Sequence, residues 1–509
     1  MQQGRHNAVN PMIDRRRIVS MLSSLPVIAL GRSERVGAAS TARGKDMATP
    51  AIARPTLFSS QSMWNATPVD PLLGDIAISP HQTPWIEEGA YASRIFFAAQ
   101  DDPPMTIMGR TGGEDIQVAN EGVWRSIVIP RFPADTMPAT GTDGHCTIID
   151  PVTGLMHGFW QLKKVGGQWR ATKYVASPLA GTGFGTASNP DNVRASGTSA
   201  AAGMMLASER GLAVLPHALA LCLDLSSFSS GPVFPATMED YKGVHGDYTG
   251  TPGHSFKMGT LFLLPPQFDA EALHWEEARV IARTLKRHGA YLVDATRGTA
   301  SLSAEIGSGW SRSSVNGVWQ NSWARDVKQI FDALRAVTSV AGWLDADGAP
   351  FTPTPWGWQN ILSMRGPWSA AKGMRAGGLQ GRYDGAADMY LVPATSTPCG
   401  MTKHLVRRDP AQTASWRQWM TGQAFFSNPV PGAEYRLAAV GTGMIDGRLL
   451  FRNGKYQQIG ATDNLSPGEE RTFPWPADAT VVEMQINKPA GPEASIRLEL
   501  TTRDPRAAG

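Results

Sequence analysis

Four residues with acid–base side chains stand at the ends of apolar runs that we predict to be buried strands. They are Asp143, His145, His217 and Asp294. Strand ends are positions from which a rigid scaffold presents reactive groups to a cleft, and a histidine beside a carboxylate suits proton transfer near neutral pH. We therefore predict that these four residues are catalytic. The structural alternatives are an ordinary turn at Asp143-Gly144 and a hydrogen-bonded core histidine at His217.

Cleavage of a glycosidic bond is one chemistry that such residues could perform. Hydrolysis needs two carboxylates that face each other across the bond, and the sequence does not pair the eligible ones. The eligible carboxylates are Asp143, Asp150, Asp224, Glu239, Asp240, Asp247 and Asp294. Elimination from a uronate instead needs a base and a cation that neutralises the substrate carboxylate. His145, Tyr174, Tyr291 and Arg170 fit that second scheme. We favour hydrolysis over elimination.

Tryptophan is unusually frequent, with 16 Trp against 9 Tyr. An indole ring presents a flat apolar face against which a pyranose ring can stack. We predict a substrate-binding group at the strand-like segments of the first half: Trp160, Trp169, Arg170 and Tyr291. For any one tryptophan, packing in the core of a β-sandwich is the alternative.

The familiar catalytic motifs are absent from the sequence. It holds no Gly-x-Ser-x-Gly elbow, no His-Glu-x-x-His helix, no Walker loop and no Cys-x-x-Cys pair. We predict no cofactor and no catalytic metal. A structural calcium ion stays open, although no loop shows a recognisable calcium spacing.

The elements that must position these residues are mostly strands. With 53 Gly and 37 Pro among 509 residues, the chain favours many turns and short strands. Two runs flank Gly166-Gly167 as in a hairpin. Helical spacing of apolar residues predicts helices over 269–289 and 318–343. The predicted fold is mainly β with a few helices, a β-rich sandwich or jelly-roll-like N-terminal domain being followed by a C-terminal β-sandwich.

The expected domain organisation has five segments. They are an export signal (1–38), a linker (39–58), a β-rich domain that carries the catalytic residues (59–310), a helix with a Gly- and Trp-rich connecting segment (311–388) and the C-terminal sandwich (389–505).

The first 38 residues have the layout of an export signal. Arg15, Arg16 and Arg17 precede the apolar run 18–30, and small residues follow at 36–38. The run is shorter than the roughly 20 residues that span a bilayer. The arginines favour the twin-arginine route, with a Sec signal as the alternative. We therefore expect a periplasmic or secreted protein without a membrane span in its mature form.

The net charge bears on the binding partners of the protein, and the cysteine count bears on its disulfide bonds. The formal net charge is only +3, which predicts no nucleic-acid partner. Three cysteines are too few for a disulfide framework. The sequence is compatible with one bridge, between Cys146 and Cys222, and equally with three buried thiols.

Three stretches of the chain resemble a group of exported bacterial proteins. The stretches are 158–160 with 168–171, 197–203 followed by 217–219, and 285–294. The resemblance covers about residues 120–300 and implies a shared fold there. It assigns no catalytic residue. Because members of the group often occur beside carbohydrate-related modules, the resemblance also implies a glycan context.

Together these observations predict an exported enzyme that degrades polysaccharides, with hydrolysis favoured over elimination and a polysaccharide or oligosaccharide as its partner. The main alternative is a non-catalytic glycan-binding or envelope-surface protein. An exported hydrolase of another class, such as an amidase or esterase, is the third hypothesis.

Overall fold

A computed structural model describes residues 56–79, 82–110, 115–240, 246, 248–251, 253–366, 368–371, 381–407, 424–425 and 429–502. The predicted export signal and most of the predicted linker lie outside these residues. Within the described part the chain is mainly β, with two α-helices, α2 (Glu276–Arg287) and α3 (Asn321–Ala333). The predicted fold class is confirmed.

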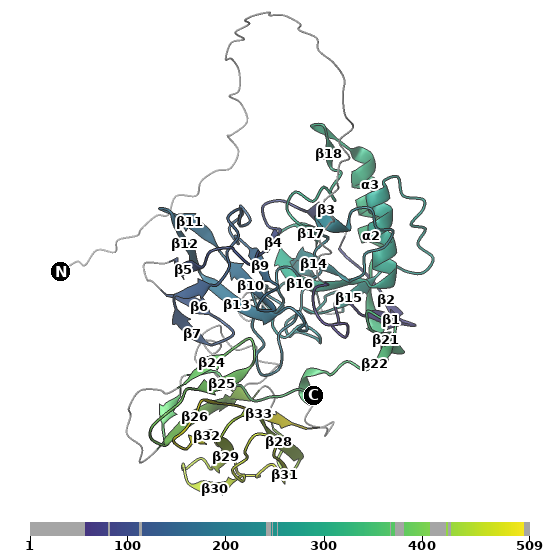
Figure 1. The fold of residues 1–509 in the computed structure, drawn as a ribbon. Helices are drawn as coiled ribbons and strands as arrows, with labels where there is room; N and C mark the ends of the chain where they lie inside the picture. Colours follow the sequence, from purple (N-terminus) through teal and green to yellow (C-terminus); the bar gives the residue numbers. More distant parts are fainter. Residues whose placement is uncertain are drawn as a thin grey trace, which may run out of the picture. The chain divides into compact units, whose positions relative to one another are not determined.

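A seven-stranded mixed sheet is the largest sheet of the first β region (Figure 1). In spatial order its strands are β2 (Leu72–Ala77), β20 (Arg335–Ser339), β15 (Leu261–Leu263), β16 (Ala290–Thr296), β14 (Leu219–Asp224), β17 (Thr299–Ser303) and β3 (Thr83–Glu87). β14 and β16 run parallel, and the other pairings of these two strands are antiparallel.

Alternation of side chains along β14 and β16 gives this sheet two apolar faces. Leu221 and Leu292 pack in one core cluster with the buried residues of α2 and α3. Ala220 and Tyr291 pack in a second cluster on the opposite face. Both helices therefore cover one face, and the other face is left for non-helical partners.

Two further sheets form the next layers. The six-stranded sheet has the order β4 (Ile95–Phe97), β9 (Cys146–Asp150), β10 (Leu155–Trp160), β13 (Lys173–Pro178), β6 (Ile116–Val118) and β7 (Val123–Arg125). The four-stranded sheet has the order β11 (Lys163–Val165), β12 (Gln168–Ala171), β5 (Met105–Gly109) and β8 (Ile127–Ile129). β11 pairs with β12 across Gly166-Gly167, which confirms the predicted hairpin.

The six-stranded sheet lies between the other two. Ile148 and Phe159 pack with Ile107 of the four-stranded sheet. Ile149 and Met156, on the opposite face, join the cluster that covers the helix-free face of the seven-stranded sheet. The residues that precede β9 are thereby brought toward the ends of β14 and β16.

The C-terminal region is a β-sandwich, as predicted. One sheet has the order β23 (Ser369–Ala370), β26 (Cys399–Arg407), β32 (Val481–Lys488), β29 (Asp446–Arg452) and β30 (Gln458–Ala461), and β27 (Ala424–Phe425) also pairs with β26. The other has the order β24 (Arg382–Asp384), β25 (Met389–Val392), β33 (Ala494–Thr501), β28 (Glu434–Thr442) and β31 (Glu470–Pro474). A single core that includes Tyr435, Phe451 and Ile496 fills the space between the sheets.

Small elements complete the described structure. A three-stranded sheet joins β1 (Thr67–Val69), β21 (Gly342–Leu344) and β22 (Pro350–Phe351), and a short hairpin joins β18 (Ser314–Val315) to β19 (Val318–Trp319). Short 3-10 helices occur at Ala207–Glu209, Leu225–Ser227 and Trp356–Trp358.

Both predicted helices are longer than the observed ones. The helix predicted over 269–289 begins only at Glu276, and the one predicted over 318–343 ends at Ala333. After that point the chain forms β20, where Ala336 and Val337 pack against opposite faces of the seven-stranded sheet. A run that mixes β-branched and small residues satisfies both a helical and an alternating pattern, and pairing with β2 and β15 decides for the strand.

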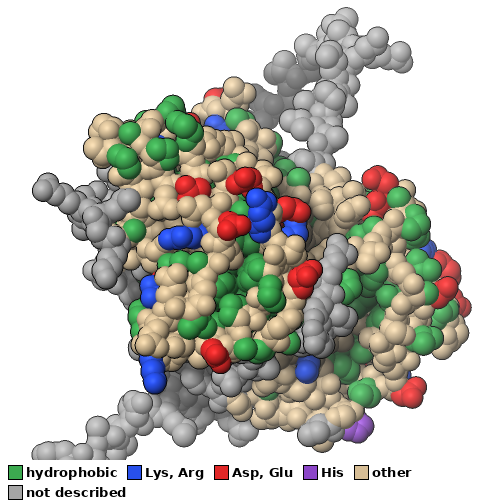
Figure 2. Space-filling view, turned by 90° about the horizontal axis from the view of Figure 1, so that it is seen from below, with side chains coloured by type: hydrophobic (Ala, Val, Ile, Leu, Met, Phe, Trp, Pro, Cys, Tyr) green, Lys and Arg blue, Asp and Glu red, His purple; other side chains and the backbone are tan. Residues whose placement is uncertain are grey.

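None of the three cysteines forms a disulfide bond. All three cysteines are free thiols, and Cys146 and Cys222 belong to different core clusters, so the bridge that the sequence allowed is not formed. No helix in the described part of the chain is long and apolar enough to cross a membrane. On the face drawn in Figure 2, acidic and basic side chains lie interspersed.

Candidate functional site

Asp294 owes its orientation to an irregularity in the pairing of β14 with β16. Leu221 is opposite Leu292, but the next residue, Cys222, is opposite Asp294, so that Val293 is an extra residue in β16. Regular alternation would turn Asp294 to the helices, as it does Leu292. The bulge instead places Asp294 beside Cys222, whose side chain belongs to the helix-free face. Bulges commonly re-aim a side chain in this way next to functional sites.

The carboxyl group of Asp294 is partly buried, and its pKa is raised well above the usual value of an aspartate. Burial raises the pKa of Asp294 to about 7; the Arg194 guanidinium lowers it, and the charges of Asp240 and Asp143 raise it further. The one hydrogen bond that it accepts within the described structure comes from the backbone N–H of Ala295, at 2.9 Å. Near neutral pH a large share of Asp294 therefore carries a proton that it can donate.

Arg194, which our sequence analysis did not single out, is held beside Asp294 by the backbone. A tight turn joins Gly197 N–H to the Arg194 carbonyl at 3.0 Å. The N–H of Ser196, inside this turn, donates to the carbonyl of the bulged Val293 at 3.2 Å. The N–H of Thr237 donates to the Ser196 carbonyl at 3.0 Å. This bond holds residues 237–240, and with them Asp240, next to the turn that carries Arg194.

Asp143 approaches this group from the six-stranded sheet. As expected for an Asp-Gly pair, Asp143-Gly144 forms a turn, and Gly144 has a φ of +45°. The carbonyl of Asp143 accepts the N–H of Gln161 at 2.7 Å, which fixes the turn against the end of β10. The indole of Trp160 donates to the Asp143 carboxylate at 3.4 Å. Trp160 and Asp143 thus lie together.

His145 is buried next to the same guanidinium. Burial lowers the pKa of His145 to about 3, and the nearby charges of Arg194 and Lys173 lower it further, against a hydrogen bond to the Phe159 backbone that raises it. The imidazole is therefore neutral at physiological pH. Its Nδ1 has no hydrogen-bond partner, so the bond to Phe159 uses Nε2, and Nδ1 keeps a free lone pair.

Five residues thus share one neighbourhood, which we call the Arg194 cluster: Asp143, His145, Arg194, Asp240 and Asp294. Other carboxylates that were eligible from the sequence have structural roles. Asp150 forms an ion pair with Arg131 at 2.9 Å, Asp224 caps the 3-10 helix after β14, and Glu239 accepts the N–H of Gly231 at 2.8 Å. Asp247 lies outside the described residues.

The cluster does not have the arrangement of a metal centre. Among the described residues, no three His, Cys, Asp or Glu side chains come together in a way that could hold a metal ion. The chemistry that the cluster can support with its own groups is proton transfer by Asp294, together with electrostatic stabilisation by its carboxylates and its one guanidinium.

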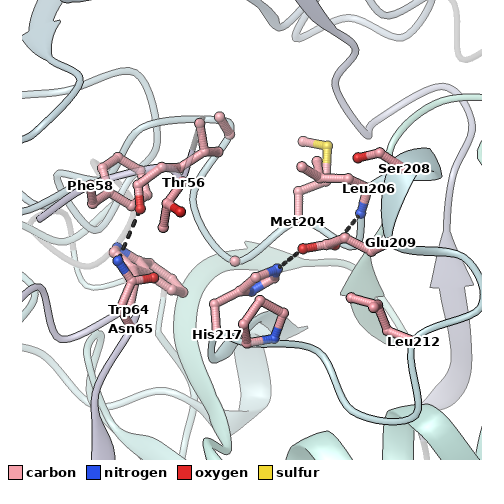
Figure 3. A pocket seen from close by; sticks show the side chains of 14 residues that line it. Thr56, Phe58, Trp64, Asn65, Met204, Leu206, Ser208, Glu209, Leu212 and His217 are labelled. Carbon is pink, nitrogen blue, oxygen red and sulfur yellow. Dashed lines mark hydrogen bonds and ion pairs between the residues drawn. The ribbon is translucent and has the colours of Figure 1, made fainter. Parts of the chain in front are cut away.

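His217, the fourth predicted catalytic residue, lies apart from the cluster in a pocket of about 170 Å³ (Figure 3). The pocket wall is mostly apolar and includes Phe58, Met204 and Leu212. No member of the Arg194 cluster lines it. Figure 3 shows the His217 ring pointing at the carboxylate of Glu209, with Nε2 and Oε1 2.9 Å apart.

Both ring nitrogens of His217 face hydrogen-bond acceptors. Nδ1 lies 2.9 Å from the Ala218 carbonyl and Nε2 lies 2.9 Å from Glu209. Two acceptors require two ring protons, so the pair is most stable as imidazolium and carboxylate. Burial lowers the pKa of His217, but the charge and hydrogen bond of Glu209 and the Ala218 carbonyl outweigh it, and the net shift is upward. Without a free lone pair, His217 is not available as a base, and we leave it out of the proposed mechanism.

This ion pair predicts a pH-dependent contribution to stability. Because the folded-state pKa of His217 lies above its unfolded value, the stabilisation is complete below the unfolded pKa and is lost as the pH rises through the folded one. Glu209→Gln should lower the free energy of unfolding by about 2 kcal/mol at pH 6. The difference from the wild type should shrink by pH 9, as measured by urea denaturation. The exposed Glu271→Gln serves as the control; an equal loss for Glu209→Gln at both pH values would contradict the assignment.

The remaining predicted substrate-binding residues lie elsewhere. Trp169 is 7% exposed and packs against Phe132 within a core cluster. Tyr291 is 1% exposed and makes an edge contact with Trp64. Both side chains fill cores because their strand positions face other sheets, so neither ring presents a face to solvent. Arg170 is partly buried and donates to the Gly109 carbonyl at 2.7 Å, which places it in the pairing of β12 with β5.

Comparison with known proteins assigns no family. No family model matches the chain, and no curated protein matches it. The resemblance over residues 120–300 stays a prediction.

Solved structures match only in part and at low similarity. Accessory secretory protein 1, 2 and 3 of Streptococcus pneumoniae matches with 9% identity and a TM-score of 0.20, over 30% of this chain and 98% of that one. A family 22 carbohydrate-binding module of Clostridium thermocellum matches with 16% identity and a TM-score of 0.17, over 30% and 96%. The lectin domain of lectinolysin, complexed with Lewis B antigen, matches with 14% identity and a TM-score of 0.16, over 27% and 92%. At these values the matches assign neither fold nor function.

Proposed function

We propose that the protein is a glycoside hydrolase whose active site is the Arg194 cluster. The observation that carries the proposal is Asp294, a partly buried carboxyl whose pKa is raised to about 7 and which lies near two further carboxylates, Asp143 and Asp240. A carboxyl group that keeps its proton near neutral pH can serve as the acid in glycosidic cleavage, beside a second carboxyl group on the other side of the bond.

In the proposed reaction Asp294 is the general acid. Its proton passes to the glycosidic oxygen as the bond from that oxygen to the anomeric carbon breaks. A water molecule supplies hydroxide to the anomeric carbon, and the one proton that it gives up passes to a neighbouring carboxylate of the cluster and finally restores the carboxyl group of Asp294. Asp143 stabilises the positive charge that develops on the sugar ring. The indole of Trp160, which holds the Asp143 carboxylate, is positioned to contact the substrate.

We also propose that the protein is exported. The layout of residues 1–38 supports delivery to the periplasm or the medium, where polysaccharides are accessible. The net charge of +3 and the interspersed charges in Figure 2 favour a glycan over nucleic acid as the partner.

Asp143→Asn tests the proposal directly. We expect purified protein to release reducing ends from at least one polysaccharide in a broad panel, and Asp143→Asn to reduce the rate at least about 100-fold. The melting temperature should change little, because Asp143 is partly exposed. Asp135→Asn, at an exposed position, is the matched control and should keep full activity. An unchanged rate for Asp143→Asn would remove Asp143 from the mechanism.

The alternative function is glycan binding without cleavage. Exposed indoles favour it: Trp319 is 61% exposed, Trp85 46% and Trp124 43%, and such rings can stack on sugars. Binding to the same panel without release of any reducing end would support this alternative and contradict the hydrolase.

A further inference from the structure

Arg194 is a buried cation whose hydrogen-bonding capacity is almost unused. The residue is only 4% exposed. A guanidinium has five N–H donors, yet within the described structure it makes one long hydrogen bond, from Nη2 to the Ala200 carbonyl at 3.4 Å. Its Nε has no partner, and it forms no ion pair with any described carboxylate. Buried cations are ordinarily paired, because an unpaired one is costly.

The groups around Arg194 do not neutralise it by contact. Asp294 is largely protonated up to about neutral pH, since its pKa is raised to about 7. The carboxylate of Asp191 forms its ion pair with Lys173, at 2.5 Å, and not with Arg194. The His145 ring is neutral, and its Nδ1 is a second buried atom without a partner. A buried donor, Nε of Arg194, and a buried acceptor, Nδ1 of His145, are therefore both unsatisfied within the cluster.

We propose that Arg194 binds the carboxylate of a uronic acid residue, so that the substrate is an acidic glycan. The planar guanidinium matches a carboxylate in a two-point contact, which a hydrated ammonium group does not. The free Nδ1 of His145 accepts a hydroxyl of the same sugar ring. This inference rests on the proposed function for its sugar, while the demand for an oxyanion follows from Arg194 itself. A sulfate ester offers similar chemistry, and the test includes it.

The experiment compares the full-length protein on matched ligand pairs by calorimetry. The acidic probes are oligosaccharides of galacturonate, of mannuronate and guluronate, and of hyaluronan, each set against its carboxyl-reduced neutral form. We expect at least about 10-fold tighter binding to the acidic member of one pair. A sulfated galactan without carboxylates is the third arm. Equal affinity within every pair, tighter binding to the sulfated probe alone, or binding of no acidic probe would each overturn the proposal.

A conservative variant links the preference to Arg194. Arg194→Lys keeps the charge but loses the planar fork, and it should reduce the difference in affinity between the preferred acidic probe and its neutral form at least about 10-fold. Arg287→Lys, at an exposed position, is the control and should leave both affinities unchanged. If Arg194→Lys fails to fold, the paired ligands on the wild type still decide. Acidic binding without cleavage would uphold this inference and contradict the hydrolase; cleavage of neutral glycans alone would do the reverse.

Discussion

Replacing Asp294 with Asn should reduce glycosidic cleavage about 1000-fold, and this loss of rate should not be a loss of folding. Asn has nearly the same shape but cannot donate the proton that the leaving oxygen requires, and general-acid catalysis is worth about 100- to 10,000-fold. Reducing-end release on the best polysaccharide of the panel, with circular dichroism on the same sample, measures both quantities. A folded Asp294→Asn variant that retains most of its rate would contradict the mechanism.

The same variant should become relatively more stable as the pH rises. The pKa of Asp294 is about 7 in the folded protein, against an unfolded value near 3.8. The wild type therefore loses stability between about pH 4 and pH 7, because the unfolded chain releases this proton first, and the loss is complete above pH 7. Asn does not titrate, so Asp294→Asn should gain on the order of 3 kcal/mol relative to the wild type across that range. Urea denaturation at pH 4.5 and pH 8 measures the difference.

Asp224 provides a control with the opposite pattern. It ends β14, the strand that is paired in parallel with β16, but its carboxylate accepts backbone N–H groups of Ser226 and Gly298. Burial raises the pKa of Asp224, yet these hydrogen bonds outweigh it and the net shift is downward. Asp224→Asn should cost about 1 kcal/mol of stability, because Asn has one acceptor oxygen where Asp224 uses two, and it should leave the cleavage rate of the folded protein intact. The two variants would then show that Asp294 acts in catalysis and that Asp224 acts only in stability, although both aspartates lie at the ends of strands.

The sequence was informative where a residue pattern has only one physical solution. Cys146–Asp150 and Met389–Val392 match the observed strands because short apolar runs bounded by turn residues have few alternatives. The helix over 318–343 was overextended because apolar spacing beyond Leu334 suits both a helix and a strand. The segment becomes a strand because it pairs with β2 and β15, which lie far away in the sequence. Local patterns do not contain such pairings.

The candidate site was predicted in part for the same reason. Asp143, His145 and Asp294 were found as polar residues at strand ends, and they lie in one neighbourhood. His217 has the same local signature but belongs to another pocket, because its partner Glu209 comes from the preceding loop. Arg194 gave no signal, since it stands in a run of small and polar residues without periodicity. Arg194 is positioned by the hydrogen bond from Ser196 to the bulged strand β16. A bulge cannot be predicted from residue spacing in the sequence.

Gly203→Ala should destabilise the protein by about 3 kcal/mol or more, because the segment before β14 has no room for a side chain. Gly203 has a φ of +65°, and an added Cβ would lie 2.4 Å from Cζ3 of Trp64 and 2.6 Å from the backbone N of Ala220. Neither neighbour can yield: Trp64 is fully buried and stacks on Phe184 at 4.8 Å, and the N–H of Ala220 donates to Gly203 itself at 2.8 Å. Overpacking and backbone strain each cost about 1–3 kcal/mol.

Gly211→Ala separates the two contributions, since Gly211 also has a positive φ, of +94°, but an added Cβ there would meet no atom within 4 Å. It should cost only the backbone strain, about 1 kcal/mol. Thermal and urea denaturation of the two variants measure the difference, and equal losses would mean that the contact with Trp64 relaxes. The comparison also bears on the pocket, because Trp64 and Gly203 both line it. A large loss at Gly203 alone would show that the part of the pocket wall formed by Trp64 and Gly203 is rigidly packed.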